Sequence, residues 1–155
     1  MLDTDVLSSL GSARANPRLR AWFDAEDPGS AVTTVISIME IESGIALLEA
    51  AQPLKASQLQ TWLDGVIETA AILPLDIESA RLLGRLRVVP ALRHFIVTSP
   101  AARQTKLGAD LAIAVIARQH DATVATGNFA DFRLIANHCP GLRAFDPFTG
   151  RTHAS

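Results

Sequence analysis

The stretch Met1-Leu2-Asp3-Thr4-Asp5-Val6-Leu7 opens the chain and decides how the rest is interpreted. Its apolar residues predict a very short buried strand over residues 1–7, which two carboxylates at alternate positions interrupt. Burying a carboxylate beside a hydrophobic strand costs free energy unless a cation or hydrogen-bond donors compensate. Asp3 is the hardest to explain as an ordinary cap, because it lies in or just beyond a strand that must be central. The opening therefore predicts an acidic site where the first strand ends.

Strands and helices alternate along the remainder of the sequence. The 155 residues, of which 48% are hydrophobic, predict one domain over 1–155 with a sizeable core. No hairpin signal is present, so the alternation predicts an α/β sandwich around a largely parallel sheet. The stretch 88–108 is expected to be a loop with one short element. The other predicted strands are 31–35, 71–75, 123–126 and 142–145, the last an edge strand, and the predicted helices are 16–23, 37–48, 55–70, 76–87 and 110–117.

Charge and cysteine content exclude several functional classes. A formal net charge of −2 gives no global nucleic-acid signature, so any RNA contact requires a local basic patch. The lone Cys139 excludes a disulfide framework and a cysteine-based zinc site. Asp3 and Asp5 interrupt the position where the apolar part of a signal peptide would lie, and no apolar stretch is long enough to span a membrane. We therefore expect a cytoplasmic protein.

Three further acidic residues stand where an apolar segment meets a loop or the start of a helix: Glu40, Asp110 and Asp131. In open parallel α/β sheets, sites form outside the carboxyl ends of the strands, where these side chains and Asp3 can meet. Hard cations such as Mg²⁺ or Mn²⁺ prefer carboxylate oxygens. Cations held there can activate a water molecule and stabilise the leaving oxygen of a phosphodiester.

Each acid also has an ordinary structural interpretation. Glu40 completes a capping box with Ser37, and Asp110 at a helix start favours the helix dipole. Asp131 is a possible turn former, and Asp5 a possible cap after the first strand. Singly these alternatives stay open, although together they require several coincidences.

Other catalytic patterns are weaker. The four histidines lack the spacing of a zinc site or a catalytic histidine, and no serine lies in a nucleophile elbow. No glycine-rich phosphate-binding loop is present.

Five short motifs, in order, resemble those of one family. Leu2-Asp3-Thr4-Asp5-Val6-Leu7-Ser8 is similar to L-D-T-N-V-L-S, and Glu40-Ile41-Glu42-Ser43-Gly44-Ile45 to E-[LI]-x-x-G-[IV]. The remaining three motifs are Asp110-Leu111-Ala112-Ile113-Ala114, Ala125-Thr126-Gly127-Asn128-Phe129-Ala130-Asp131-Phe132 and Asp146-Pro147-Phe148. Together they resemble the PIN-domain ribonucleases, and within them the VapC-type toxins and FitB-like plasmid-stability proteins.

The resemblance implies a three-layer α/β/α sandwich with a mainly parallel central sheet of four to five strands. It also implies an Mg²⁺-dependent (or Mn²⁺-dependent) endoribonuclease, the toxin of a type II toxin–antitoxin system. The implied catalytic and metal-binding acids are Asp3, Glu40, Asp110 and Asp131. The secondary polar residues of the site are Thr4, Asp5, Thr126 and Asn128.

The sequence departs from the family pattern at several points. Asp5 replaces the usual Asn, and Gly127 replaces a common Arg, which removes a possible phosphate contact. If Asp5 joins the other acids, at least one carboxyl should keep its proton well above the ordinary Asp pKa of about 3.9 without metal. The first strand lacks the apolar lead-in of most members, as expected of a late or truncated start.

Segment 88–108 matches the family poorly, and it supplies the candidate RNA contacts Arg93, Arg103 and Lys106. The departures leave open a catalytically silent PIN-like module with a binding or regulatory role. Because acids around a metal do not select RNA over DNA, a DNA-directed single-strand or flap nuclease also stays open.

The resemblance implies two protein partners and an RNA substrate. It predicts a homodimer and a small antitoxin whose C-terminal segment lies across the acidic site or an adjacent hydrophobic groove. Such antitoxins often place an Arg or Lys among the carboxylates. Exposed apolar residues on the helices spanning Leu48 to Val66 are a plausible receiving surface, unless those residues all belong to the core.

Overall fold

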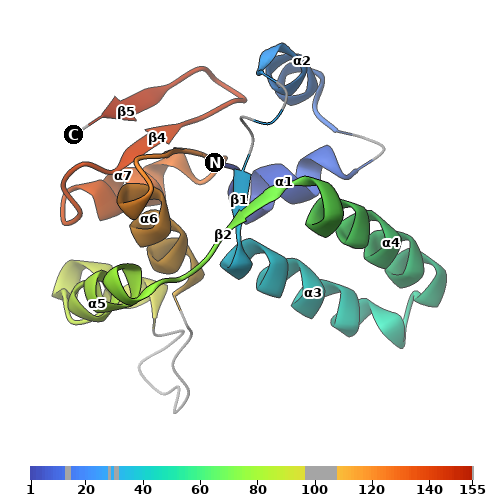
Figure 1. Cartoon of the computed structure of the whole chain (residues 1–155), viewed down its shortest axis with the longest axis horizontal. Helices are drawn as coiled ribbons and strands as arrows, with labels where there is room; N and C mark the ends of the chain where they lie inside the picture. Colours follow the sequence, from blue (N-terminus) through green and yellow to red (C-terminus); the bar gives the residue numbers. More distant parts are fainter. Residues whose placement is uncertain (13–14, 28, 30–31, 97–107, 155) are drawn as a thin grey trace.

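Short strands and longer helices alternate in the computed structural model, which describes residues 1–12, 15–27, 29, 32–96 and 108–154 (Figure 1). This is an α/β fold rich in helix. The helices are α1 (Thr4–Leu10), α2 (Pro17–Ala25), α3 (Val35–Glu49), α4 (Pro53–Thr69), α5 (Ile77–Leu86), η1 (a 3₁₀ helix, Pro90–Phe95), α6 (Ala109–Gln119) and α7 (Phe129–Ala136). The strands are β1 (Val32–Thr34), β2 (Ala71–Leu73), β3 (Thr123–Ala125), β4 (Arg143–Phe145) and β5 (Thr152–Ala154).

Side-chain caps set where several helices begin. Asp3 caps α1, Asn16 caps α2 with Pro17 in the first turn, and Asp76 caps α5 through the backbone N–H of Ser79. Short polar side chains satisfy the otherwise unpaired N–H groups of a first helical turn, so these positions favour a helix start. The predicted start of the second helix at Asn16-Pro17 is therefore confirmed.

The strands form two small sheets. β1 pairs with β2 in parallel, while β4 pairs with β3 in parallel and with β5 in antiparallel register. The first residues of the chain lie between the sheets: the N–H of Leu2 donates to the carbonyl of Val32 in β1, at 2.7 Å. The N–H of Asp3 donates to the carbonyl of Ala125 in β3, at 3.0 Å. The chain start thus joins the edges of the two sheets (Figure 1).

The predicted continuous sheet of four to five strands was wrong. The described strands are only three residues long, and Leu2 makes a single parallel bridge to Ala125, too little to form a ladder. The predicted strand over 1–7 was also wrong, because the Asp3 cap starts α1 at Thr4. Two carboxylates at alternate positions indicated an interrupted strand, whereas they mark the N-terminus of a helix, where acidic side chains are favoured.

Two elements beyond residue 127 differ from the sequence-based expectation. The segment around Asp131 is not only a loop, because α7 begins at Phe129 and places Asp131 in its first turn. β4 is not an edge strand, because a turn at Asp146 returns the chain as β5. The N–H of Gly150 donates to the carbonyl of Asp146 in this turn. The local sequence did not predict the turn.

Two hydrophobic clusters make up the core. One surrounds α6, whose residues 111–117 are all buried, as predicted from their apolar character on every side. This helix contacts α3, α5, α7 and η1. The second cluster joins α1, α2, α3 and α4 and includes Val6, Leu19 and Leu63. No helix in the described part of the chain has both the length and the apolar character needed to cross a membrane.

Candidate acidic site

The predicted acids come from four helices that meet where the two hydrophobic clusters adjoin. Asp3 is the cap of α1, and Glu40 lies on α3, which follows β1 directly. Asp110 is in the first turn of α6, and Asp131 is in the first turn of α7, which follows β3. Strand ends and helix starts therefore bring these side chains together, as expected for an α/β fold.

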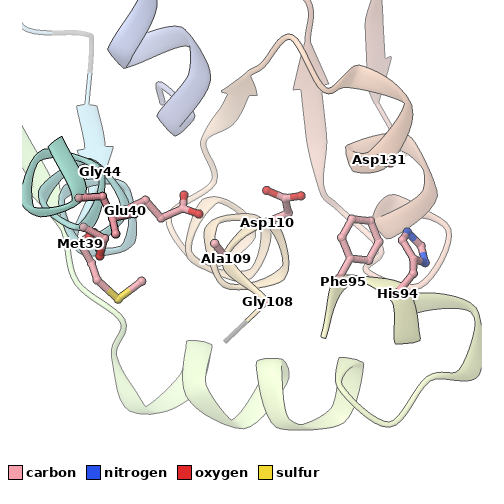
Figure 2. A pocket seen from close by; sticks show the side chains of 11 residues that line it. Met39, Glu40, Gly44, His94, Phe95, Gly108, Ala109, Asp110 and Asp131 are labelled. Carbon is pink, nitrogen blue, oxygen red and sulfur yellow. Dashed lines mark hydrogen bonds between the residues drawn. The ribbon is translucent and has the colours of Figure 1, made fainter. Parts of the chain in front are cut away.

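Three of the acids line one cavity of about 700 Å³: Glu40, Asp110 and Asp131. Figure 2 shows the carboxylates of Glu40 and Asp110 directed toward the same space between α3 and α6. The other lining residues are Met39, Ser43, Gly44, Leu47, His94, Phe95, Gly108 and Ala109. None of these described lining residues is Lys or Arg, so the cavity is acidic with an apolar margin.

Asp3 is not among the residues that line this cavity, and only 2% of its surface is exposed. Its Oδ1 accepts the N–H of Thr4 at 2.7 Å, and its Oδ2 accepts the hydroxyl of Thr126 at 2.7 Å. Burial and the neighbouring Asp5 raise the pKa of Asp3 to about 8, against the lowering effect of these two hydrogen bonds. Without a cation, Asp3 therefore keeps its proton near neutral pH, as expected if five carboxyls crowd one region.

Thr4 connects α1 to α3. Its hydroxyl donates to Oε2 of Glu40 at 2.6 Å. The capping-box interpretation of Glu40 was wrong, because α3 begins at Val35 and Ser37 lies inside the helix. The cap is Thr34, whose Oγ1 accepts the N–H of Ser37 at 3.1 Å. The carboxylate of Glu40 is thus available to the site.

Asp5 bridges the start of α1 and the loop after β3. Its Oδ1 accepts the N–H of Val6 at 2.6 Å, and its Oδ2 accepts the N–H of Gly127 at 2.8 Å. A Cβ on Gly127 would lie 2.5 Å from that Oδ2 atom, so this approach requires glycine. Burial raises the pKa of Asp5 despite both hydrogen bonds. Asp5 therefore contacts the loop that leads to Asn128 and also adds charge to the acidic region.

Asp110 lies at the electrostatic centre of the cluster. Burial, followed by the charges of Glu40, Asp131 and Asp5 in that order of influence, raises its pKa to about 6, while His94 acts in the opposite direction. The like charges of these three carboxylates therefore oppose the ionisation of Asp110. A shifted carboxyl in a cavity is typical of a functional site, although ion networks also cause such shifts.

Thr126 and Asn128 follow β3 and connect Asp3 to the start of α7. Thr126 is fully buried, and besides donating to Asp3 its Oγ1 accepts the N–H of Asn128 at 2.9 Å. Asn128 is exposed, and it precedes α7 without a side-chain cap hydrogen bond. Thr126 therefore orders the turn that leads from Asp3 to Asp131.

The chemistry of the donor set fits a hard divalent cation, because all the donors are oxygens and their charges repel one another. Within residues 1–12, 15–27, 29, 32–96 and 108–154, no three acidic, His or Cys side chains are close enough to form a metal cage as they stand. The acids thus form a charged cluster and not a preformed coordination shell.

The predicted basic patch is only partly described. Arg93 is exposed on η1 but does not line the cavity. Arg103 and Lys106 lie outside the described residues. Sequence analysis missed two residues that do line the cavity, His94 and Phe95, because neither shows a metal-ligand or catalytic spacing. Their position after Pro90 at the end of a short helix gave no separate signal.

The fold and the cavity define a class of protein: an α/β domain with carboxylates gathered near its strand ends. No family model matches the chain. A stretch of 64 residues is 31% identical to ribonuclease VapC14 of Mycobacterium tuberculosis (strain CDC 1551 / Oshkosh), covering 41% of this chain and 62% of that protein. The match therefore spans less than two thirds of the length of that relative.

Solved structures resemble the chain over nearly its whole length. A chain of FitAB bound to an IR36 DNA fragment has 26% identity and a TM-score of 0.73, covering 98% of this chain and 97% of that one. A chain of FitAcB from Neisseria gonorrhoeae has 27% identity and a TM-score of 0.73, covering 96% and 97%. VapBC-1 from nontypeable Haemophilus influenzae shares the fold at 20% identity and a TM-score of 0.67, covering 96% and 98%. The likeness to VapC-type toxins that the motifs indicated is thus confirmed.

Proposed function

We propose that the protein is a metal-dependent endoribonuclease and the toxin of a toxin–antitoxin pair. The observation that carries the proposal is that Glu40, Asp110 and Asp131 line one cavity, where the charges of the other two acids help to raise the pKa of Asp110. Such repulsion stores free energy that binding of a divalent cation releases. The likeness to a VapC ribonuclease supports RNA as the substrate.

The residues that would hold the cation are Asp110, Glu40 and Asp131 in the cavity, together with the buried Asp3. When bound, Mg²⁺ or Mn²⁺ supplies an activated water and stabilises charge on a phosphodiester. Thr4 holds Glu40 and Thr126 holds Asp3, so two hydroxyls fix the directions of two acids. Bonds of this kind orient metal ligands from outside the coordination shell.

The test uses purified protein and a labelled single-stranded RNA, with Mg²⁺, with Mn²⁺, or with chelator. We expect Asp110→Asn to reduce cleavage by about 100-fold or more, because the substitution removes the central charge at nearly constant shape. Asp24→Asn, on the exposed face of α2, is the matched control and should cleave like the parent. Cleavage by Asp110→Asn at the parent rate would contradict the proposed site.

A second candidate is the catalytically silent module, and one observation favours it: no three described acids form a metal cage. Calorimetric titration with Mn²⁺ separates the candidates. An active site should bind Mn²⁺ and lose the binding with Asp110→Asn, whereas a silent module should show no binding in either protein. Comparing RNA and DNA of the same sequence in the cleavage assay then tests for a DNA-directed nuclease.

An antitoxin and a second copy of the chain are the proposed protein partners. Among the similar structures, FitAB is described as bound to a DNA fragment, which supports this proposal. Two others of the same fold are described as a toxin–antitoxin complex from Klebsiella pneumoniae and as DNA-bound VapBC from Salmonella typhimurium. The α3–α4 pair exposes apolar side chains: Leu47 is 83% exposed and Leu54 is 82% exposed, while Leu63 is fully buried. Exposed apolar surface of this kind fits a partner better than water. Light scattering of the purified chain, alone and with its co-expressed antitoxin, measures both associations.

A further inference from the structure

The side of the cavity opposite Glu40 is formed by two aromatic rings, which have no role in the proposed cation site. His94 and Phe95 end η1, and their side chains lie across Asp110 from Glu40 (Figure 2). The two ring centroids are 4.1 Å apart with an angle of 38° between the ring planes. The result is a pair of adjoining flat rings at the edge of an acidic cavity.

The two rings differ in how firmly they are held. Phe95 is half-buried and packs against the hydrophobic cluster around α6, so its position is fixed. His94 is exposed, and no residue that the structure describes forms a hydrogen bond with its imidazole. A fixed phenyl ring with an open imidazole beside it offers both a stacking surface and unused hydrogen-bonding atoms.

An RNA strand would gain from such a surface here, because the lining residues that the structure describes include no Lys or Arg. The described lining residues include three carboxylates and no Lys or Arg, so the backbone phosphates are repelled except where a cation intervenes. Proteins that bind single-stranded RNA obtain much of their affinity by stacking bases on aromatic and histidine rings. A volume of about 700 Å³ is also ample for one nucleotide.

We infer that His94 and Phe95 form a nucleobase subsite, in which a base of single-stranded RNA stacks on the outward face of this ring pair while its phosphate lies toward the acidic cluster. The inference rests on the proposed function for the substrate class and deepens it. It also assigns specificity to this side of the cavity: imidazole nitrogens can hydrogen-bond to base edges, whereas the phenyl ring accepts any base.

Binding is tested in full-length protein carrying Asp110→Asn, so that the RNA stays intact. The probe is a short fluorescein-labelled single-stranded RNA of mixed sequence, with Mg²⁺ present. We expect His94→Ala and Phe95→Leu each to raise the Kd by about 5-fold or more, because one stacked base contributes about 1–3 kcal/mol. His138→Ala, an exposed histidine after α7, is the matched control and should leave the Kd unchanged.

A second probe reports stacking directly. RNA carrying 2-aminopurine loses fluorescence when that base stacks, and this quenching should weaken in Phe95→Leu. A merely structural role for Phe95 would alter the urea midpoint without altering the quenching of the folded protein. If Phe95→Leu does not fold, His94→Ala decides alone.

The outcomes separate this inference from the proposed function. RNA binding that depends on His94, in a parent protein that cleaves no RNA, would support the subsite and contradict the ribonuclease. Cleavage by the parent, with a Kd unchanged in both variants, would overturn the subsite and leave the ribonuclease standing. Absence of RNA binding would overturn the subsite. Binding of a protein partner, but not of RNA, through His94 and Phe95 would overturn it as well.

Discussion

The carboxylate of Asp5 is subject to two opposing effects. It accepts backbone N–H groups from Val6 and Gly127, which stabilise its charge. Burial nevertheless raises its pKa, so the charged form is disfavoured overall in the folded protein. A raised pKa means that the associated stability is present at low pH and is lost as the pH rises through the folded-state pKa.

Asp5→Asn should therefore stabilise the cation-free protein, and more so at high pH, because burial disfavours the charged form of Asp5. Asn keeps one acceptor oxygen and loses one hydrogen bond, a loss of about 1 kcal/mol that reduces the gain. We expect a melting temperature about 2–4 °C higher in EDTA at about pH 8, and a smaller difference at about pH 5. Thermal unfolding followed by circular dichroism measures this, with Asp24→Asn as control. A lower melting temperature at both pH values would show that the hydrogen bonds outweigh the charge.

At the scale of the element, the N-terminus of α3 positions Glu40. Thr34 is fully buried, and its Oγ1 accepts the N–H of Ser37 while it contacts the Ser37 hydroxyl at 3.2 Å. The cap also stands at the end of β1, so strand and helix meet at a single residue. Any shift of this turn would shift Glu40 relative to Asp110.

Thr34→Val keeps the shape of the side chain and removes the cap. We expect the free energy of unfolding to fall by about 1–2 kcal/mol, since the Ser37 N–H and hydroxyl both lose a buried partner. Urea denaturation measures the loss. Thr69→Val is the matched control, because the exposed Thr69 hydroxyl bonds only to the carbonyl of Gly65 near the end of α4, and it should change stability by less than about 0.5 kcal/mol. Equal effects at the two positions would contradict the assigned cap.

Helices with local signals were predictable from the sequence, whereas elements that depend on distant contacts were not. Asn16-Pro17 and the apolar run 111–117 were interpreted correctly because each signal is local: a cap with proline, and burial on every side. The strand predicted over 1–7 failed because whether Asp3 ends a strand or caps a helix depends on distant partners, Ala125 and Thr126. β5 was missed because three residues carry too little pattern.

The site residues also divide into those that the sequence predicted and those that only the packing reveals. Glu40, Asp110 and Asp131 were recognised from residue type and from their place at strand ends, and the structure brings all three to one cavity. His94 and Phe95 were not recognised, since only packing against α6 places them beside Asp110. A lone histidine followed by phenylalanine predicts nothing by itself.

At the scale of the whole molecule, the raised pKa values make stability depend on pH. Those of Asp110 and Asp3 rise from an ordinary value of 3.8 to about 6 and about 8. Their contribution to stability is fully present below about pH 4 and is lost as the pH rises, through pH 6 for Asp110 and pH 8 for Asp3. Asp76 and Asp146 have lowered pKa values, so their contribution is lost only as the pH falls below about 4.

The cation-free protein should therefore become less stable between about pH 4 and pH 8. Asp110→Asn should flatten the part of this decline below about pH 6, a change of about 3 kcal/mol. Urea unfolding across this range in EDTA measures the profile. Adding Mg²⁺ or Mn²⁺ should restore stability mainly at high pH, where the carboxylates are ionised. A cation-free protein whose stability rises steadily to pH 8 would contradict the crowded cluster.

The contact between Asp5 and Gly127 joins positions 122 residues apart. At both positions the chain departs from the VapC-type motifs that its sequence resembles, and this contact links the two departures. A side chain at 127 would displace the carboxylate, since its Cβ would lie 2.5 Å from Oδ2. A mutation that restores only the arginine would therefore collide with Asp5. We expect substitutions at the two positions to be coupled, so that the cost of a side chain at 127 depends on whether residue 5 is Asp.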